Sequence, residues 1–238
     1  MQWLNKVTAS LYAALIEGER WKLYLRGLGK TLEISAGAVV LGILIGVIVA
    51  IIKVSAVQKK MGGHCGVLLR AGEWLCDVYL TVIRGTPVML QLMIIYFSVF
   101  ASMSDGTLAA IVGFGINSGA YVAEIVRSGI QSINRGPPEA GRSLGLSAGM
   151  SMRFIILPQA FRNILPALFN EFITLLKETS VASVIAVPDM VKNATNIKTK
   201  IYNIAPLYVT ALIYLVLVVG LTVVQRKIEG RLRESDRR

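Results

Sequence analysis

Histidine and cysteine are scarce in this chain, whose 238 residues include one histidine and two cysteines. His64, Cys65 and Cys76 lack the spacing of metal ligands, so we expect no metal site and interpret all three as structurally neutral. The sequence also offers no cluster of histidine, aspartate and glutamate and no activated nucleophile. These gaps argue against a membrane-embedded enzyme.

A nucleotide-binding motif is missing as well. The triplet Gly29-Lys30-Thr31 resembles the end of a phosphate-binding loop, but Tyr24 stands five positions before Gly29, where such a loop needs glycine. We therefore expect that this chain does not hydrolyse ATP itself and holds no cofactor.

The N-terminal segment lacks the pattern of a removable signal peptide, because it carries Glu17 and Glu19 and has no apolar core that ends in a small-residue cleavage site. The chain also shows no internal repeat that would predict an inverted-repeat secondary transporter. The rings of Trp3 and Trp21 favour a helix at the membrane interface, which we assign to residues 1–25.

Apolar residues, in contrast, are abundant. They make up 54% of the chain, the mean hydropathy is +0.62, and they cluster in long runs, which indicates an all-α polytopic membrane protein. The formal net charge of +11 is that of many nucleic-acid-binding proteins. The basic residues, however, lie between and after the apolar runs, as the positive-inside rule requires, so we expect no nucleic-acid partner.

Five stretches are long enough to cross a hydrocarbon layer of about 30 Å. The predicted spans are residues 31–52, 85–104, 106–123, 154–188 and 201–225. The fourth stretch contains prolines and charged residues, and a charged group at mid-membrane costs about 2.5–3.5 kcal/mol. We therefore expect this broken crossing to face a protein interior or a water-filled path.

The segments between and after these runs set the predicted orientation. Residues 73–83 and 189–200 are expected to form helices on the membrane surface. Residues 227–238 form a basic tail, which predicts a cytoplasmic C-terminus. With five spans, the N-terminus then lies outside.

The stretch from Gly136 to Pro158 begins as a polar segment in this apolar chain and predicts a docking surface. Pro138 is suited to the first turn of a helix, Glu139 then interacts favourably with the helix dipole, and Gly145 is placed for a C-terminal cap. The resulting helix has roughly two turns, and so short a helix is marginal in water. We expect packing against another segment to hold it in place.

Several motifs occur in collinear order over about residues 25–226. They are Arg84-Gly85-Thr86-Pro87, Gly119-Ala120-Tyr121-Val122-Ala123-Glu124-Ile125, Glu139-Ala140-Gly141 with Gly145-Leu146-Ser147, Ile155-Ile156-Leu157-Pro158-Gln159-Ala160 and Leu175-Leu176-Lys177-Glu178-Thr179-Ser180. Together they resemble the permease subunits of ATP-binding-cassette importers, in the polar amino acid uptake branch of histidine, arginine and glutamine permeases. The third motif resembles the EAA loop of that family, with Gly141 where alanine is usual and Pro137 where glutamine is common.

The resemblance implies the type I importer permease fold, with five core transmembrane helices over residues 26–226 and a coupling loop at about 134–150. It implies a prokaryotic cytoplasmic membrane and several partners: two cytoplasmic ATPase subunits that bind ATP and magnesium, an external amino-acid-binding protein, and a second permease chain. The transported substrate is expected to be a polar or charged amino acid. Which amino acid it is, and whether the two permease chains are identical, stays open.

Candidate site residues fall into three groups. The ATPase-coupling candidates are Glu139, Ala140, Gly141, Arg142 and Gly145; the substrate-path candidates are Glu171, Asn117, Glu124, Thr86 and Gln91; the gate candidates are Lys177, Glu178, Thr179 and Ser180. Glu171 leads the second group because a carboxylate in a broken crossing suits a substrate ammonium or guanidinium group. A structural ion pair of Glu171 with Arg162 or Lys177 is the alternative, as is helix packing for the other members of that group.

Two other functions stay open at this stage. The first is a self-sufficient channel or secondary transporter, which the proposed docking surface disfavours. The second is a permease of another importer branch, for phosphate, sulfonate or metals, which the motifs at residues 119–125 and 175–180 disfavour.

Overall fold

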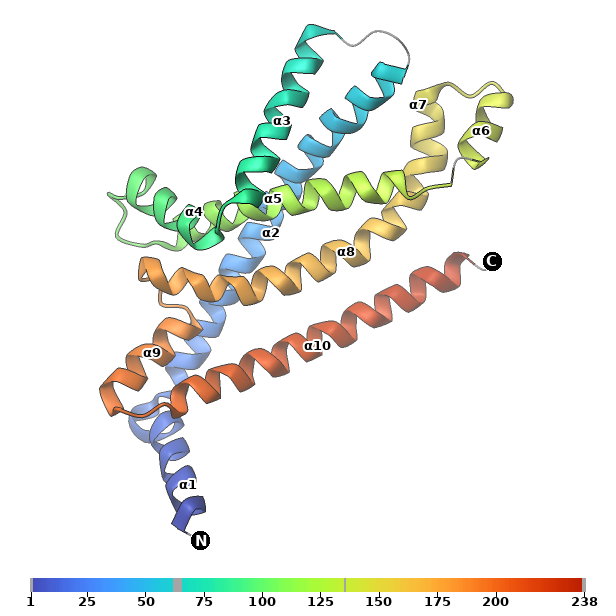
Figure 1. The fold of residues 1–238 in the computed structure, drawn as a ribbon. Coiled ribbons are helices and arrows are strands. Elements are labelled where there is room, and N and C mark those ends of the chain that lie inside the picture. The colour runs from blue at the N-terminus through green and yellow to red at the C-terminus, as the bar shows by residue number, and fades with distance from the viewer. Residues whose placement is uncertain (1, 62–65, 135, 237–238) are drawn as a thin grey trace. The chain divides into compact units, whose positions relative to one another are not determined.

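The computed structural model describes residues 2–61, 66–134 and 136–236, so His64, Cys65 and Arg135 lie outside the described residues. Every regular element in these ranges is helical. The α-helices are α1 (Gln2–Leu15), α2 (Trp21–Met61), α3 (Val67–Gly85), α4 (Val88–Ile94), α5 (Thr107–Gln131), α6 (Gly136–Ser143), α7 (Ala148–Ser151), α8 (Leu157–Glu178), α9 (Met190–Ile201) and α10 (Ala205–Asp236) (Figure 1). Short 3₁₀ and π segments are η1 (Glu17–Glu19), η2 (Ile95–Val99), η3 (Met152–Ile156) and η4 (Thr179–Ile185).

Within the described ranges, three helical stretches are long and apolar enough to cross a membrane. They are Glu17–Ala56, Thr107–Gln131 and Ala205–Leu232, and a fourth is added if α3 and α4 with η2 are counted as one broken span. The fold is therefore that of a polytopic helical membrane protein. The number five for the core spans remains a prediction, because α8 with its charged residues does not pass the same test of length and composition.

Two boundaries differ from the sequence-based expectation. The predicted span over residues 85–104 is helical only from Val88 to Val99, and the preceding helix α3 extends to Gly85. Pro87 has no N–H and disfavours helical geometry in the residue before it, and Thr86 is accordingly extended, with φ −122° and ψ 147°. The predicted surface helix at residues 73–83 is in fact the longer α3.

Other expected elements appear with longer bounds. The first predicted span lies within the 41-residue helix α2, and the last continues as α10 into the predicted basic tail. Residues 189–200 form α9, capped by Asp189. The predicted break in residues 154–188 lies at the η4 segment after Glu178, whereas α8 itself continues through Pro166.

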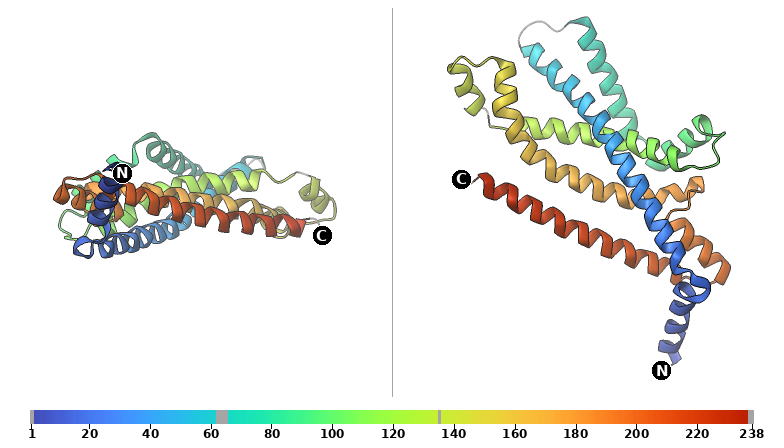
Figure 2. Two further views of the ribbon diagram at one scale, coloured as in Figure 1. Left: turned by 90° about the horizontal axis from the view of Figure 1, so that it is seen from below. Right: turned by 180° about the vertical axis from the view of Figure 1, so that it is seen from behind.

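The chain divides into two compact units, of which the first comprises residues 1–40, 87–115 and 172–223. Its main core gathers small and branched side chains around the fully buried Phe114. A second cluster joins α1, the start of α2, α9 and the start of α10 around Ala14 and Tyr24. Figure 2 shows α9 beside the first part of α2, where the Asn193 side-chain amide donates to the Leu23 carbonyl at 2.9 Å.

The second unit comprises residues 41–86, 116–171 and 224–238. The end of α2 and α3 form an antiparallel hairpin in it (Figure 1). Glycines allow α5 to approach α2 closely: a Cβ atom at Gly46 would lie 2.6 Å from Val122, and one at Gly42 would lie 3.0 Å from Ser118. Small residues at such positions allow two membrane helices to pack closely.

Candidate functional site

The short helix α6 matches the capped helix that the sequence predicts. Gly145 has a φ of 86°, a conformation in which glycine carries no steric penalty. Its N–H bonds to the Arg142 carbonyl at 2.9 Å, and the Leu146 N–H bonds to the Gly141 carbonyl at 3.0 Å. This pair of bonds is a Schellman C-cap, which satisfies carbonyls that the helix end would otherwise leave unpaired.

Packing against the following segment holds α6 in place. Gly141 is buried, and a Cβ atom there would lie 2.6 Å from Cδ1 of Ile155 in η3. Glu139, Ala140 and Arg142 are exposed on the remaining surface. The helix therefore presents an acidic residue in its first turn and a basic residue in its last turn, and both charges are favourable to the helix dipole.

Glu171, the leading substrate-path candidate, is held by α5. The Ser118 hydroxyl donates to Oε1 of Glu171 at 2.8 Å. Ser118 is fully buried and its neighbour Asn117 is 4% exposed, so polar groups of α5 line the interior at this level. Asn117 and Glu171 were both predicted from the sequence, whereas Ser118 was not, because 53 residues separate the bonded pair in the chain.

The remaining substrate-path candidates lie elsewhere. The Thr86 hydroxyl donates to the Val82 carbonyl at 2.8 Å and thus supports the end of α3. Gln91 is a half-buried residue of α4 in the first unit, whereas Glu124 belongs to α5 in the second. Gln91 therefore belongs to a different unit from Glu171, whereas Thr86 and Glu124 belong to the same unit as Glu171.

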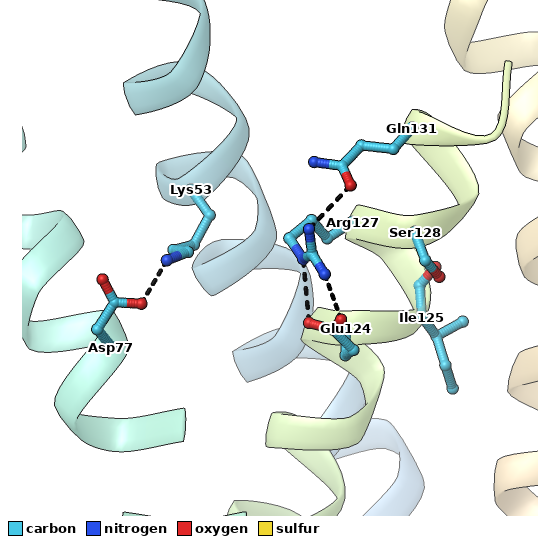
Figure 3. A network of polar contacts seen from close by, with 7 residues as sticks. All are labelled: Lys53, Asp77, Glu124, Ile125, Arg127, Ser128 and Gln131. Carbon is cyan, nitrogen blue, oxygen red and sulfur yellow. Dashed lines mark hydrogen bonds and ion pairs between the residues drawn. The ribbon is translucent and has the colours of Figure 1, made fainter. Parts of the chain in front are cut away.

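Glu124 instead lines a charged cavity of about 610 Å³ in the second unit. Its carboxylate accepts hydrogen bonds from Arg127, one of them from Nε at 3.0 Å, and Arg127 also donates to Gln131 at 2.8 Å. On the facing wall Lys53 of α2 bonds to Asp77 of α3. Figure 3 shows both ion pairs, with Ile125 and Ser128 on another face of α5.

Of the residues that line this cavity, only Glu124 was predicted from the sequence as a site residue. The lining residues are Lys53, Val54, Asp77, Leu80, Thr81, Arg84, Gly85, Glu124, Arg127 and Gln131. The pair of Glu124 with Arg127 has the i, i+3 spacing of a helix ion pair, which was a usable signal. The pair of Lys53 with Asp77 depends on the register of the α2–α3 hairpin, which the sequence alone does not specify.

The gate candidates lie at the end of α8 in the first unit. Thr179 is fully buried, and its hydroxyl donates to the Leu176 carbonyl at 2.7 Å. Lys177 and Ser180 line a second cavity of about 430 Å³ together with residues of α9 and α10, among them Tyr214. The buried hydroxyl groups of Tyr214, Thr31 and Thr179 lie close together in the first unit. Their burial marks a polar interior behind the predicted gate.

Two carboxyl groups outside the membrane-spanning helices have shifted pKa values. Hydrogen bonds from the Thr107 hydroxyl and N–H lower the pKa of Asp105 at the start of α5. Burial raises the pKa of the fully buried Asp189 to about 6, although the N–H groups of Lys192 and Val191 favour its charged form. Asp189 therefore caps α9, but its burial removes water from the carboxylate and so disfavours the charged form.

Comparison with known proteins extends these observations. Residues 42–234 match the family model described as the binding-protein-dependent transport system inner membrane component. The chain is 38% identical over 216 residues to the arginine transport system permease protein ArtQ of Bacillus subtilis, covering 89% of this chain and 93% of that protein.

Two solved structures have similar folds. The crystal structure of an amino acid ABC transporter with histidines has a TM-score of 0.79 and 38% sequence identity, covering 88% of this chain and 94% of that one. An inward-facing structure of the MetNI methionine ABC transporter has a TM-score of 0.75 at 21% identity, covering 90% and 98%, and its likeness concerns the fold alone. The family match and the identity to ArtQ over most of both chains show that this chain belongs to the amino acid ABC transporter permeases, a family of binding-protein-dependent inner membrane components.

Proposed function

We propose that this chain forms part of the membrane pathway of an importer that moves a polar or basic amino acid into the cell by alternating access. ATP hydrolysis in a separate cytoplasmic subunit drives the cycle, an external binding protein delivers the substrate, and a second permease chain completes the pathway. The arginine transport of the relative ArtQ and the carboxylate of Glu171 both favour a cationic substrate.

The observation that carries the coupling step is the arrangement of α6. Its buried side fits against Ile155 through Gly141, while Glu139 and Arg142 stay exposed. A force on the exposed side therefore reaches η3 through a direct contact, and η3 leads into α8, which carries Glu171. The resemblance to the EAA loop supports α6 as the coupling helix, and Gly145 shapes its end.

Co-purification tests the docking surface. The tagged permease is co-expressed with the candidate ATPase subunit and purified in mild detergent. We expect that Glu139→Lys captures at least about tenfold less ATPase than the wild type, because a reversed charge at an interface places like charges together. Glu17→Lys is the control, since it reverses another exposed acidic residue, the ion-pair partner of Arg20 in η1, outside the α6 surface. Equal capture by the Glu139→Lys and wild-type chains argues against docking at α6.

Uptake into proteoliposomes tests transport itself. Vesicles contain the permease and ATPase, with the binding protein on the opposite side, and the readout is accumulation of labelled arginine, histidine or glutamine. We expect accumulation only when ATP is present on the ATPase side. Equal uptake by vesicles that lack the ATPase supports a self-sufficient channel or secondary transporter instead.

A further inference from the structure

The charges that line the 610 Å³ cavity are not fully balanced within it. Three cations and two carboxylates face this space, and two of the cations are paired: Lys53 with Asp77, and Arg127 with Glu124. The remaining cation is Arg84, near the end of α3. The cavity thus carries one excess positive charge, at a guanidinium group.

Arg84 keeps its hydrogen-bond donors free within the described residues. Its guanidinium lies over the ring of Tyr121, with 5.9 Å between the guanidinium carbon and the ring centroid, and it interacts electrostatically with Glu124 without a hydrogen bond or ion pair among the described residues. The aromatic face orients the guanidinium while leaving its N–H groups available. A guanidinium with free donors matches a carboxylate or phosphate group, to which it can bond through two N–H groups.

Arg84 and Glu171 both contact the same stretch of α5, although Glu171 does not line the cavity itself. Ser118, which bonds to Glu171, and Tyr121, which supports Arg84, are three residues apart on α5 and so lie about one turn from each other on neighbouring faces. One short stretch of α5 therefore supports both a carboxylate and a free guanidinium. An amino acid needs this combination, because its carboxylate and its ammonium group are close together and opposite in charge.

The geometry points to Arg84 as the residue that binds the α-carboxylate of the transported amino acid in this cavity. This inference rests on the proposed transport function and adds to it a specific recognition of the carboxylate. The volume of the cavity is within the range of sites for small molecules. Two carboxylates on its walls, Asp77 and Glu124, repel a dianion but accept a ligand that also carries a positive charge.

A pair of probes tests this recognition. The transport assay first identifies an amino acid that the wild-type complex accumulates, beginning with L-arginine. Binding of that amino acid and of its decarboxylated amine, which is agmatine in the case of arginine, is then measured by scintillation proximity on the purified permease and ATPase complex. We expect the wild type to bind the amino acid at least about tenfold more tightly than the amine, because the amine lacks the carboxylate that would form the charge-assisted bidentate contact.

Substitutions assign this preference to Arg84. Arg84→Gln should weaken amino acid binding by at least about tenfold and leave amine binding within about twofold, and Arg84→Lys should fall between the two. Arg70→Gln is the matched control, because Arg70 is an exposed arginine of the same helix that does not line the cavity. Co-purification of the ATPase with each variant confirms that the chain has folded.

Three outcomes overturn the inference. The first is an Arg84→Gln variant that keeps the wild-type preference for the amino acid, and the second is an equal loss of amino acid and amine binding, which indicates a structural role. The third is loss of a co-purifying anionic phospholipid from Arg84→Gln with amino acid binding unchanged, which assigns Arg84 to a lipid phosphate. Absence of ATP-driven uptake of all the standard amino acids by the wild type contradicts the proposed function itself, and this result is separate from the other three.

Discussion

The Ser118 hydroxyl donates a 2.8 Å hydrogen bond to Glu171 and thereby joins α5 to α8. In a membrane interior a carboxylate needs such a partner, because a buried polar group without one is costly. Ser118 supplies one such donor from the neighbouring helix.

We predict that Glu171→Gln lowers ATP-driven uptake at least about tenfold while the ATPase still co-purifies with the permease. The amide keeps the size of the side chain but loses the negative charge that would attract a substrate cation. Glu33→Gln is a suitable control, because Glu33 is a half-exposed partner of Lys30 in the first unit. Unchanged uptake kinetics in Glu171→Gln remove this residue from the substrate path.

The close approach of α2 and α5 at Gly46 gives a prediction about stability. A methyl group there would lie 2.6 Å from Cβ of Val122 and 2.8 Å from the backbone nitrogen of Ala123, and backbone atoms do not move easily. We expect Gly46→Ala to lower the stability by about 1–3 kcal/mol, measured by thermal unfolding in detergent. Gly29→Ala in the same helix meets no atom within 4 Å and should be neutral or stabilising by up to about 1 kcal/mol. Equal effects of the two substitutions contradict close packing at Gly46.

Asp189 gives a prediction about pH. Because burial raises its pKa from 3.8 to about 6, the charged form is disfavoured in the folded chain. Its contribution to stability is therefore complete below about pH 4 and is lost as the pH rises to about 6. Relative to Asp189→Asn, which can still cap α9, the wild type should lose up to about 3 kcal/mol between pH 4 and pH 7. Unfolding curves at several pH values check this, and a constant difference between the two chains contradicts it.

The contact between Gly141 and Ile155 gives a prediction about coupling. A valine at position 141 meets Ile155 and should displace α6, so we expect Gly141→Val to reduce ATPase capture by about tenfold. Shortening the opposing side chain in Gly141→Val/Ile155→Ala should restore part of the capture. The single variant Ile155→Ala serves as the control. If the double variant is no better than Gly141→Val, the contact does not set the position of α6.

Local signals were sufficient for some elements and not for others. Pro138 and Gly145 correctly predicted a short capped helix, because both act through their own backbone geometry. Pro87 carried an equally local signal, and α4 begins directly after it at Val88, but the uncharged run predicted a span to residue 104 whereas the helical structure ends at Val99. A count of uncharged residues reports composition alone. The end of α3 depends instead on local backbone geometry, here the missing N–H of Pro87 and the extended conformation of Thr86.

Contacts between residues far apart in the chain could not be predicted from the sequence. The bond between Ser118 and Glu171, and the pairing of Lys53 with Asp77, both depend on the register between helices. Arg84 was recognised as part of a motif but received no role, since its free donors and its position over Tyr121 become visible only in three dimensions.

The chain that follows the C-terminal end of α6 is held in one conformation, which bears on the strength of the proposed partner binding. Gly145 fixes the turn after the helix, and the Ser147 hydroxyl accepts a hydrogen bond from the Met150 N–H at 3.3 Å to begin α7. The chain between the two helices therefore has a defined conformation before any partner arrives. A preorganised surface loses little conformational entropy on association, so under the proposed docking of an ATPase at α6 most of the interaction energy would appear as affinity.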